Sequence, residues 1–159
     1  MRQLIEGLGA QMAEALKVSV TRPPSDRKLF RSVLVLGMGG SGIGGAVLAD
    51  MVRATSPVPV QAVSDQVLPG WVDAECLVVV SSYSGNTEET LEALNEAERR
   101  GCTLAAVTSG GALGARADEG GWPVVQMPGG NPPRSQFGRS FLGLCALLHA
   151  FEVLPAASW

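Results

Sequence analysis

A cluster of hydroxyl side chains in the middle of the chain follows an apolar run and contains no cation. From position 81 the sequence reads Ser-Ser-Tyr-Ser-Gly-Asn-Thr, and no lysine or arginine lies between Ser81 and Glu98. Hydroxyl groups both donate and accept hydrogen bonds, and glycine allows a backbone to approach a ligand closely. Such a segment can bind an anion through hydroxyls and backbone amides instead of a lysine.

A second unusual segment is the glycine-rich run 37–45, which reads Gly-Met-Gly-Gly-Ser-Gly-Ile-Gly-Gly. Both segments follow an apolar run and precede an expected helix. The start of a helix has unpaired N–H groups and partial positive charge, so it favours anions such as phosphate. If the two helix starts lie at one place, a phosphate could be held there by the hydroxyls of Ser41, Ser82, Ser84 and Thr87.

Other interpretations of these segments stay open. Gly37, Gly39 and Gly42 satisfy the dinucleotide-binding pattern G-x-G-x-x-G, and Asp65 at the end of the next expected strand completes it formally. Residues 86–89 resemble a capping box, so a single hydroxyl could simply cap a helix. The pattern G-x-x-x-x-G-K-[ST] is absent, which excludes an ordinary P-loop. The whole cluster beside a second glycine-rich helix start favours ligand binding.

The elements that must position these segments alternate between strands and helices. Helical spacing of apolar residues predicts an amphipathic helix at the start of the chain, and Pro-rich residues 21–27 predict a loop. Apolar runs predict five strands, at residues 32–36, 58–64, 75–81, 103–108 and 123–127. The expected helices are residues 2–17, a helix that follows the glycine-rich turn and ends at about residue 53, residues 88–100 and residues 137–154. The last helix is apolar nearly all round, which predicts a central position or a contact with another subunit.

This alternation predicts an α/β fold: a three-layer α-β-α sandwich with a five-stranded parallel sheet. In a flavodoxin-like strand order, the order reverses between the first and third strands, and ligands bind beyond the carboxyl ends of the strands there. The glycine-rich segment follows the first strand and the hydroxyl segment follows the third. The fold class therefore predicts that the two segments meet.

Length, composition and charge narrow the classes of function. A chain of 159 residues with 46% hydrophobic and 17% charged residues predicts one globular domain. The net charge of −3 disfavours nucleic acid as a partner. Three cysteines without C-x-x-C spacing disfavour a disulfide framework and a zinc site, and they favour a reducing cytoplasm. No signal peptide is recognisable, and no apolar stretch approaches the about 20 residues that a membrane span needs.

Three motifs in order resemble one known family. Residues 37–42, 82–91 and 132–135 (Pro-Pro-Arg-Ser) are similar to the sugar isomerase (SIS) domain, and most similar to the N-terminal domain of bifunctional phosphoglucose/phosphomannose isomerases. The similarity spans about residues 30–155. It implies a single SIS domain over 1–159 that needs no cofactor or metal. It also implies a phosphorylated hexose as ligand, with Arg134 near the reacting carbons and the phosphate at Gly40, Ser41, Ser82, Ser84 and Thr87.

The resemblance implies aldose–ketose isomerisation through an enediolate. That reaction needs an acid or base for ring opening, a base for the carbon-bound proton and positive charge near the developing oxyanion. Arg134 follows two prolines, which stiffen its loop and could fix where the guanidinium points. The related isomerases take the glutamate and histidine of the proton transfers from a second SIS domain, which we expect to be absent here. We expect His149 to be packed or at an interface, and neither it nor Glu152 to be catalytic.

Three functions stay open on the sequence. The first is a phosphosugar isomerase domain completed by a second SIS domain or by homodimerisation. The second is a non-catalytic module that binds a sugar phosphate for regulation. The third is a flavodoxin-like protein that binds FMN, because residues 82–88 also resemble the FMN phosphate loop of flavodoxins. That loop normally follows the first strand, whereas here it follows the third.

Overall fold

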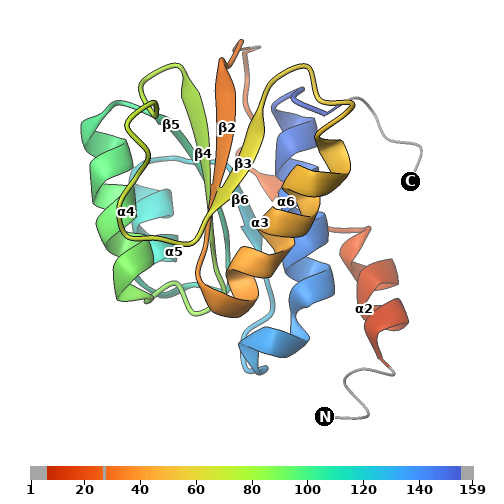
Figure 1. Cartoon of the computed structure of the whole chain (residues 1–159). Helices are drawn as coiled ribbons and strands as arrows, with labels where there is room; N and C mark the ends of the chain where they lie inside the picture. The colour runs from red at the N-terminus through yellow and green to blue at the C-terminus, as the bar shows by residue number, and fades with distance from the viewer. Residues whose placement is uncertain (1–6, 27, 155–159) are drawn as a thin grey trace.

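The computed structural model describes residues 7–26 and 28–154. Its elements form three layers, with one sheet between two layers of helices (Figure 1). The parallel strands come from apolar, largely β-branched runs. Every residue of β2 (Ser32–Leu36) and β4 (Cys76–Ser82) is buried, as expected for central strands covered by helices on both faces. The other parallel strands are β3 (Val60–Val63), β5 (Thr103–Thr108) and β6 (Val124–Gln126).

Within the described residues, the sheet has six strands in the order β1-β6-β5-β4-β2-β3. Its five parallel strands keep the flavodoxin-like order, and β2 lies beside β4. The prediction of an all-parallel, five-stranded sheet is wrong at one edge, where β1 (Val20–Thr21) pairs antiparallel with β6. A strand of two residues has no readable alternation, and half of β1 falls in the segment expected to be a loop.

Five α-helices are described: α2 (Leu8–Ala15), α3 (Gly39–Val52), α4 (Glu88–Arg99), α5 (Gly111–Glu119) and α6 (Phe137–Ala150). The helix expected over 2–17 is shorter at its C-terminal end, and residues 1–6 lie outside the described part. The last helix ends four residues earlier than expected. No helix was expected at α5, because two of its nine residues are glycines and only Leu113 and Ala117 are buried.

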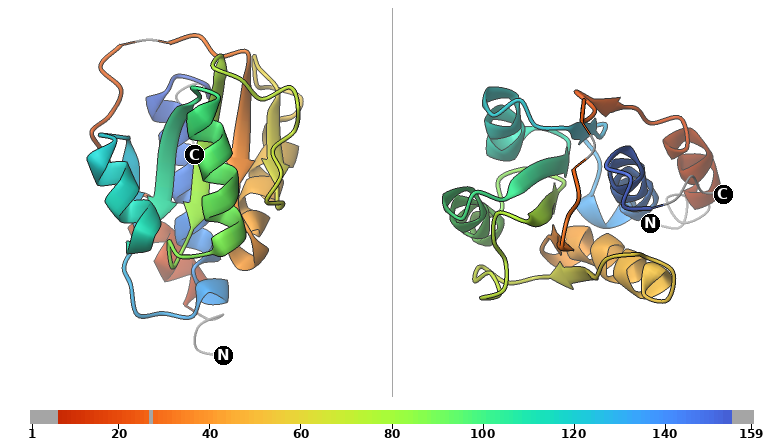
Figure 2. Two further views of the ribbon diagram at one scale, coloured as in Figure 1. Left: turned by 90° about the vertical axis from the view of Figure 1, so that its left-hand side faces the viewer. Right: turned by 90° about the horizontal axis from the view of Figure 1, so that it is seen from above.

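The helices cover both faces of the sheet (Figure 2). On one face α4 and α5 pack over the core cluster that contains Leu94 and Leu113. On the other face α3 and α6 pack over a second cluster, and α2 lies outside α6. Because α6 is covered by the sheet, α3 and α2, it is central, as its apolar sequence indicates. Among the described helices, none is both long and apolar enough to cross a membrane.

Candidate functional site

The carboxyl ends of β2 and β4 lie side by side, with Leu36 opposite Val80 in the parallel register. In Figure 1 this edge of the sheet is at the bottom, where α3 and α4 begin. The backbones of the glycine-rich segment after β2 and the hydroxyl segment after β4 are in contact, because a Cβ atom added to Gly37 would lie 2.8 Å from the carbonyl oxygen of Ser81. The prediction that the glycine-rich and hydroxyl segments meet is therefore confirmed.

The glycine-rich segment is not a loop ahead of the helix, because α3 already begins at Gly39 and Met38 is its N-cap residue. Its glycines allow close packing of that helix on the sheet. A Cβ atom on Gly42 would lie 2.4 Å from the carbonyl oxygen of Gly37, and one on Gly45 would lie 2.6 Å from a methyl carbon of Val35. The segment thus places the N-terminal turn of α3 directly against the end of β2.

The hydroxyl segment forms a compact turn between β4 and α4. The hydroxyl oxygens of Ser82 and Thr87 lie 3.3 Å apart, and the backbone N–H of Gly85 donates to the Ser82 hydroxyl (3.2 Å). Thr87 is the N-cap residue of α4, but its side chain makes no capping hydrogen bond. The capping box expected over residues 86–89 is therefore not formed, and the hydroxyl of Thr87 lies beside that of Ser82 at the helix start.

A direct hydrogen bond joins the two segments. The backbone N–H of Tyr83 donates to the hydroxyl of Ser41 (3.2 Å), which lies in the first turn of α3. Ser84 is exposed, and its hydroxyl accepts the backbone N–H of Asn86 (3.3 Å). Together with Gly40, the serines at 41, 82 and 84 and Thr87 form one group at this edge, which we call the cradle.

A third helix start lies beside the cradle, and no pattern in the sequence indicated it. The side-chain oxygen of Asn86 accepts the backbone N–H of Ala112 in the first turn of α5 (2.9 Å). The carbonyl of Gly85 accepts the N–H of Leu113 (2.9 Å). Gly85 has φ +69°, in the left-handed region that favours glycine. The hydroxyl segment is thus anchored on α5 as well as on α3.

Arg134 lies in the loop that returns from β6 to α6. It is the middle residue of a short 3₁₀ helix, η1 (Pro133–Ser135), and it is exposed. The backbone of this turn approaches α3, because a Cβ atom on Gly40 would lie 3.6 Å from the Cα atom of Arg134. The structure therefore brings the Arg134 backbone next to the cradle.

Tyr83 connects the hydroxyl segment to this returning loop, a function that sequence reasoning missed. Its phenol donates to the carbonyl of Pro128 (2.9 Å) and accepts the backbone N–H of Asn131 (2.9 Å). Its own carbonyl accepts both the N–H (3.0 Å) and the hydroxyl (2.6 Å) of Ser109. Tyr83 is the single tyrosine in the chain, and this was the one feature of the sequence that could have drawn attention to it. Through it, the hydroxyl segment and the Arg134 loop are held as one unit.

The charges near the cradle come from exposed side chains at its rim. Glu88 and Glu89 are in the first turn of α4, and both are exposed, so water screens their repulsion of a bound anion. Two buried hydroxyls flank the cradle, those of Ser81 at the end of β4 and Thr90 in α4. Within the described part of the chain neither has a hydrogen-bond partner.

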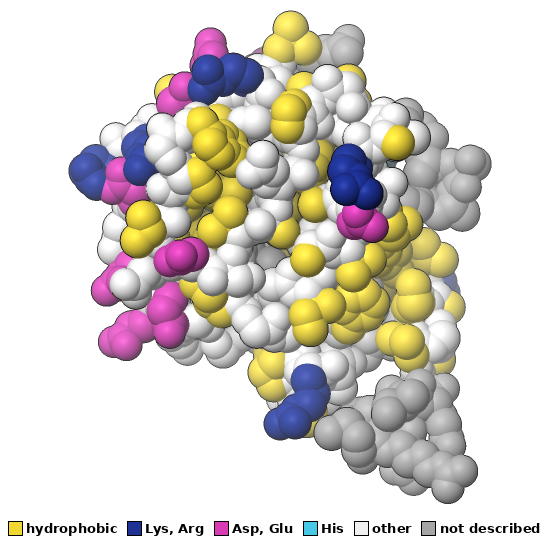
Figure 3. Space-filling model, viewed as in Figure 1, with side chains coloured by type: hydrophobic (Ala, Val, Ile, Leu, Met, Phe, Trp, Pro, Cys, Tyr) yellow, Lys and Arg dark blue, Asp and Glu magenta, His cyan; other side chains and the backbone are white. Residues whose placement is uncertain are grey.

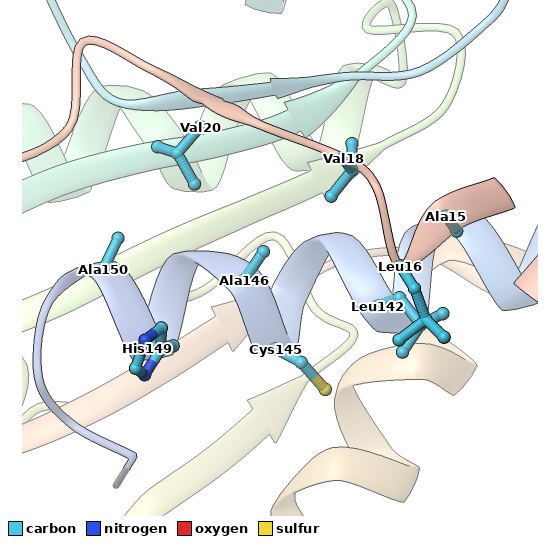
Figure 4. Close-up of a pocket in the computed structure, with 9 residues that line it drawn as sticks. All are labelled: Ala15, Leu16, Val18, Val20, Leu142, Cys145, Ala146, His149 and Ala150. Atoms are coloured by element: carbon cyan, nitrogen blue, oxygen red, sulfur yellow. The ribbon is translucent and has the colours of Figure 1, made fainter. Parts of the chain in front are cut away.

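His149 lies far from the cradle. The cradle is close to η1, just before α6 begins, whereas His149 is in the last turn of that helix. A helix of 14 residues is about 20 Å long, so the imidazole cannot reach the cradle. The side chain is exposed rather than packed in the core of this chain, and it lines an apolar hollow between α6 and the Ala15–Val20 segment (Figure 4).

Across residues 7–26 and 28–154, no group of three or more His, Cys, Asp or Glu side chains could bind a metal ion. What the cradle offers is backbone N–H groups at helix starts and hydroxyls, with the backbone of Arg134 beside Gly40. These groups bind a phosphate or another oxyanion well.

Comparison with known proteins finds relatives that are similar over most of this chain. The chain is 44% identical over 115 residues to a bifunctional phosphoglucose/phosphomannose isomerase of Caldicellulosiruptor bescii, a match that covers 72% of this chain and 34% of the relative. It is 42% identical over 109 residues to the protein of the same description from Thermoplasma acidophilum, covering 69% and 33%. A D-glucosamine-6-phosphate 4-epimerase of Sulfolobus acidocaldarius is 33% identical over 132 residues, covering 82% and 42%. No model of a known protein family matches the chain.

Solved structures share the fold at low sequence identity. The C-terminal domain of glucosamine-fructose-6-phosphate aminotransferase from Francisella tularensis has a TM-score of 0.70 and 13% identity, covering 98% of this chain and 49% of that one. A tagatose-6-phosphate ketose/aldose isomerase from Escherichia coli has a TM-score of 0.58 and 17% identity, covering 94% and 42%. The sequence resemblance to the bifunctional isomerases is thus confirmed, and this chain spans about one third of their length.

Proposed function

We propose that this chain is the sugar-phosphate-binding SIS domain of an enzyme of the bifunctional phosphoglucose/phosphomannose isomerase type. Its sequence matches about one third of the length of those enzymes. The observation that carries the proposal is the direct hydrogen bond between Tyr83 and Ser41, which joins two helix starts into one cradle. Phosphate suits this place, because both helix starts present N–H groups and partial positive charge.

Within the cradle, the side chains have distinct functions in the proposed complex. The hydroxyls of Ser82 and Thr87, already 3.3 Å apart, donate to the phosphate oxygens. Gly40 contributes its backbone N–H at the start of α3, where a larger side chain would approach the Arg134 backbone. Hydrogen bonds to an ionised acceptor are about twice as strong as neutral ones, so several of them can replace a lysine.

Arg134 supplies positive charge for the chemical step. With the phosphate in the cradle, the sugar carbons extend toward the loop that contains η1. A guanidinium there stabilises the oxyanion that develops on the enediolate. This contribution is specific to the transition state, so removing the guanidinium should lower turnover more than it lowers substrate affinity.

The proton transfers need an acid and a base that the described residues do not place at the cradle. His149 is at the far end of α6, and Glu88 and Glu89 are at the exposed rim. We infer that a second SIS domain, or a second copy of this chain, supplies the acid and base. A surface suited to such pairing lies on α3, where Ile43, Val47 and Met51 are 56%, 36% and 57% exposed. Their four-residue spacing puts them on one helix face; apolar side chains gather over this region in Figure 3.

An isomerase assay tests the proposal. Fructose 6-phosphate is supplied to the purified chain, to the chain mixed with a separately produced C-terminal SIS domain of a related isomerase, and to the same mixture with Arg134→Ala. We expect turnover near background for the chain alone, because positioned acid and base groups contribute about 10²–10⁴-fold each. Activity should appear in the mixture and fall with Arg134→Ala. Full turnover by the chain alone would contradict the inference that a second domain or a second copy supplies the acid and base.

One alternative has a specific observation in its favour. Because Glu88 and Glu89 are at the exposed rim of the cradle and His149 is distant, a module that binds a sugar phosphate without turnover would have the same site. Binding without activity in every mixture would favour that regulatory function. The FMN alternative has no such support, and a flavin spectrum of the purified protein would be needed to revive it.

A further inference from the structure

Two of the three cysteines occupy neighbouring positions on adjacent parallel strands. Cys76 is the first residue of β4, and Cys102 immediately precedes β5. The register pairs Leu77 with Thr103, so the two cysteines face each other one step earlier. They lie at the amino ends of these strands, which is the opposite edge of the sheet from the cradle.

Their side chains also point to the same face of the sheet. Cys76 is in the core cluster with Val78 and Val80, and Cys102 packs against that cluster, which also contains Leu104. Neighbouring strands are about 4.7–4.9 Å apart, and disulfide-bonded cysteines have Cα atoms about 4.4–6.8 Å apart. The Cα separation expected from the strand spacing therefore falls within the range found for disulfides.

The two sulfur atoms already contact one residue. The backbone N–H of Asp73 donates to the sulfur of Cys76 (3.4 Å), and the thiol of Cys102 donates to the carbonyl oxygen of Asp73 (3.2 Å). Both sulfur atoms therefore lie beside the backbone of Asp73. The hydrogen bond of the Cys102 thiol to the carbonyl is a weak one, so forming a disulfide in its place costs little hydrogen bonding.

The two thiols differ in access to solvent. Cys76 is fully buried, whereas Cys102 is half-buried. Burial, with a smaller contribution from the neighbouring Cys76, raises the pKa of the Cys102 thiol. The thiolate is the reactive form, so reaction at Cys102 is slow at neutral pH and accelerates as the pH rises toward that pKa. Cys145 is buried in the other core, and burial raises its pKa to about 11.

We propose that Cys76 and Cys102 form a reversible disulfide when the folded protein meets a low-molecular-weight disulfide. The Cys102 thiolate attacks one sulfur of that disulfide, which forms a mixed disulfide and releases one thiolate. The Cys76 thiolate then attacks the Cys102 sulfur, so the second small thiolate leaves. In sum two protein thiols are oxidised, and one small disulfide is reduced to two small thiols.

This bond would enclose β4, the hydroxyl segment and α4 in one covalent loop. The disulfide would constrain the unfolded chain and so raise the melting temperature, by an amount on the order of 5–10 °C for a loop of this size. Because the cradle is at the other end of β4, oxidation should leave its binding of ligands unchanged. The proposal does not depend on the function inferred for the cradle.

Peptide mapping tests the proposal, because trypsin places each cysteine on its own fragment. Cleavage after arginine gives residues 54–99, 101–116 and 140–159, which contain Cys76, Cys102 and Cys145 respectively. The native protein is incubated with glutathione disulfide at pH 8.5, quenched with acid, alkylated and digested without reductant. We expect fragments 54–99 and 101–116 joined by one disulfide, and fragment 140–159 alkylated.

Two variants complete the test. Cys145→Ser should form the same bond at the same rate, whereas Cys102→Ser should leave Cys76 reduced. Treatment with dithiothreitol should return the melting temperature of the oxidised protein to its starting value. The proposal would be overturned by glutathione persisting on Cys102 with Cys76 still free, or by a bond between two chains. Bonding that also involves Cys145 would overturn it too.

Discussion

Tyr83→Phe should loosen the loop that contains Arg134 without disturbing the core. The substitution keeps the aromatic ring of a residue that is 7% exposed, and removes only the hydroxyl. The Pro128 carbonyl then loses its donor, and the Asn131 N–H loses its acceptor. Leaving a buried donor or acceptor without its hydrogen-bond partner lowers the free energy of unfolding by about 1–3 kcal/mol. Asn131 is half-buried and Pro128 exposed, so water can replace part of the loss.

We therefore expect the free energy of unfolding to fall by about 1–2 kcal/mol, which lowers the melting temperature by about 2–8 °C in a domain of this size. Urea unfolding followed by circular dichroism measures the change. Ser25→Ala is the matched control, because it also deletes one hydroxyl, one that is exposed and bonded to its neighbour Asp26. That control should change stability by less than about 0.5 kcal/mol.

The same substitution should also weaken the contribution of Arg134. A double-mutant cycle with Arg134→Ala, read out as isomerase activity in the mixture with a second SIS domain, measures the coupling between the two residues. If Tyr83→Phe is as stable as the wild type and Arg134→Ala has the same effect in both backgrounds, the phenol does not connect the two loops. The description of the hydroxyl segment and the Arg134 loop as one unit would then be wrong.

Three further predictions follow from single contacts. Gly85→Ala should destabilise the fold by at least about 1–2 kcal/mol in thermal unfolding, because of the left-handed backbone alone, and its Cβ atom would also lie 1.9 Å from the Gly110 carbonyl oxygen. The hydrogen bond from the Glu75 backbone N–H lowers the pKa of the Asp73 carboxyl. The Asp73 carboxylate therefore contributes to stability above its unfolded pKa of about 3.9, and this contribution is lost as the pH falls through the lower folded pKa. In Asp73→Asn, the free energy of unfolding should depend less on pH in that range. Met51→Lys should abolish pairing with a second SIS domain or a second copy in light scattering while leaving the melting temperature unchanged, because its side chain is exposed.

Strong local patterns account for what the sequence predicted correctly. The buried runs at β2 and β4 and the amphipathic α4 have clear periodicity, and strand order then placed the two unusual segments together. The elements that were missed have weak patterns. β1 has two residues and depends on β6 for its pairing, and α5 contains two glycines.

Within the site, residue types were readable but contacts between distant segments were not. The hydroxyls were recognised because they are clustered in sequence. The phenol of Tyr83 bonds residues more than forty positions away, and nothing local signals such a partner. The start of α3 inside the glycine-rich run follows from close packing on Val35, a tertiary contact that overrides the low helix propensity of glycine.

The central claim, that the cradle binds the phosphate of a sugar phosphate, is tested most directly by calorimetric titration with fructose 6-phosphate and with unphosphorylated fructose. Thr87→Glu places a carboxylate at the start of α4, inside the cradle. Thr55→Glu makes the same change at an exposed position beyond the other end of α3. We predict that the wild type and Thr55→Glu bind fructose 6-phosphate but not fructose, and that Thr87→Glu binds neither while remaining folded. Equal binding of fructose 6-phosphate by all three proteins would contradict the claim.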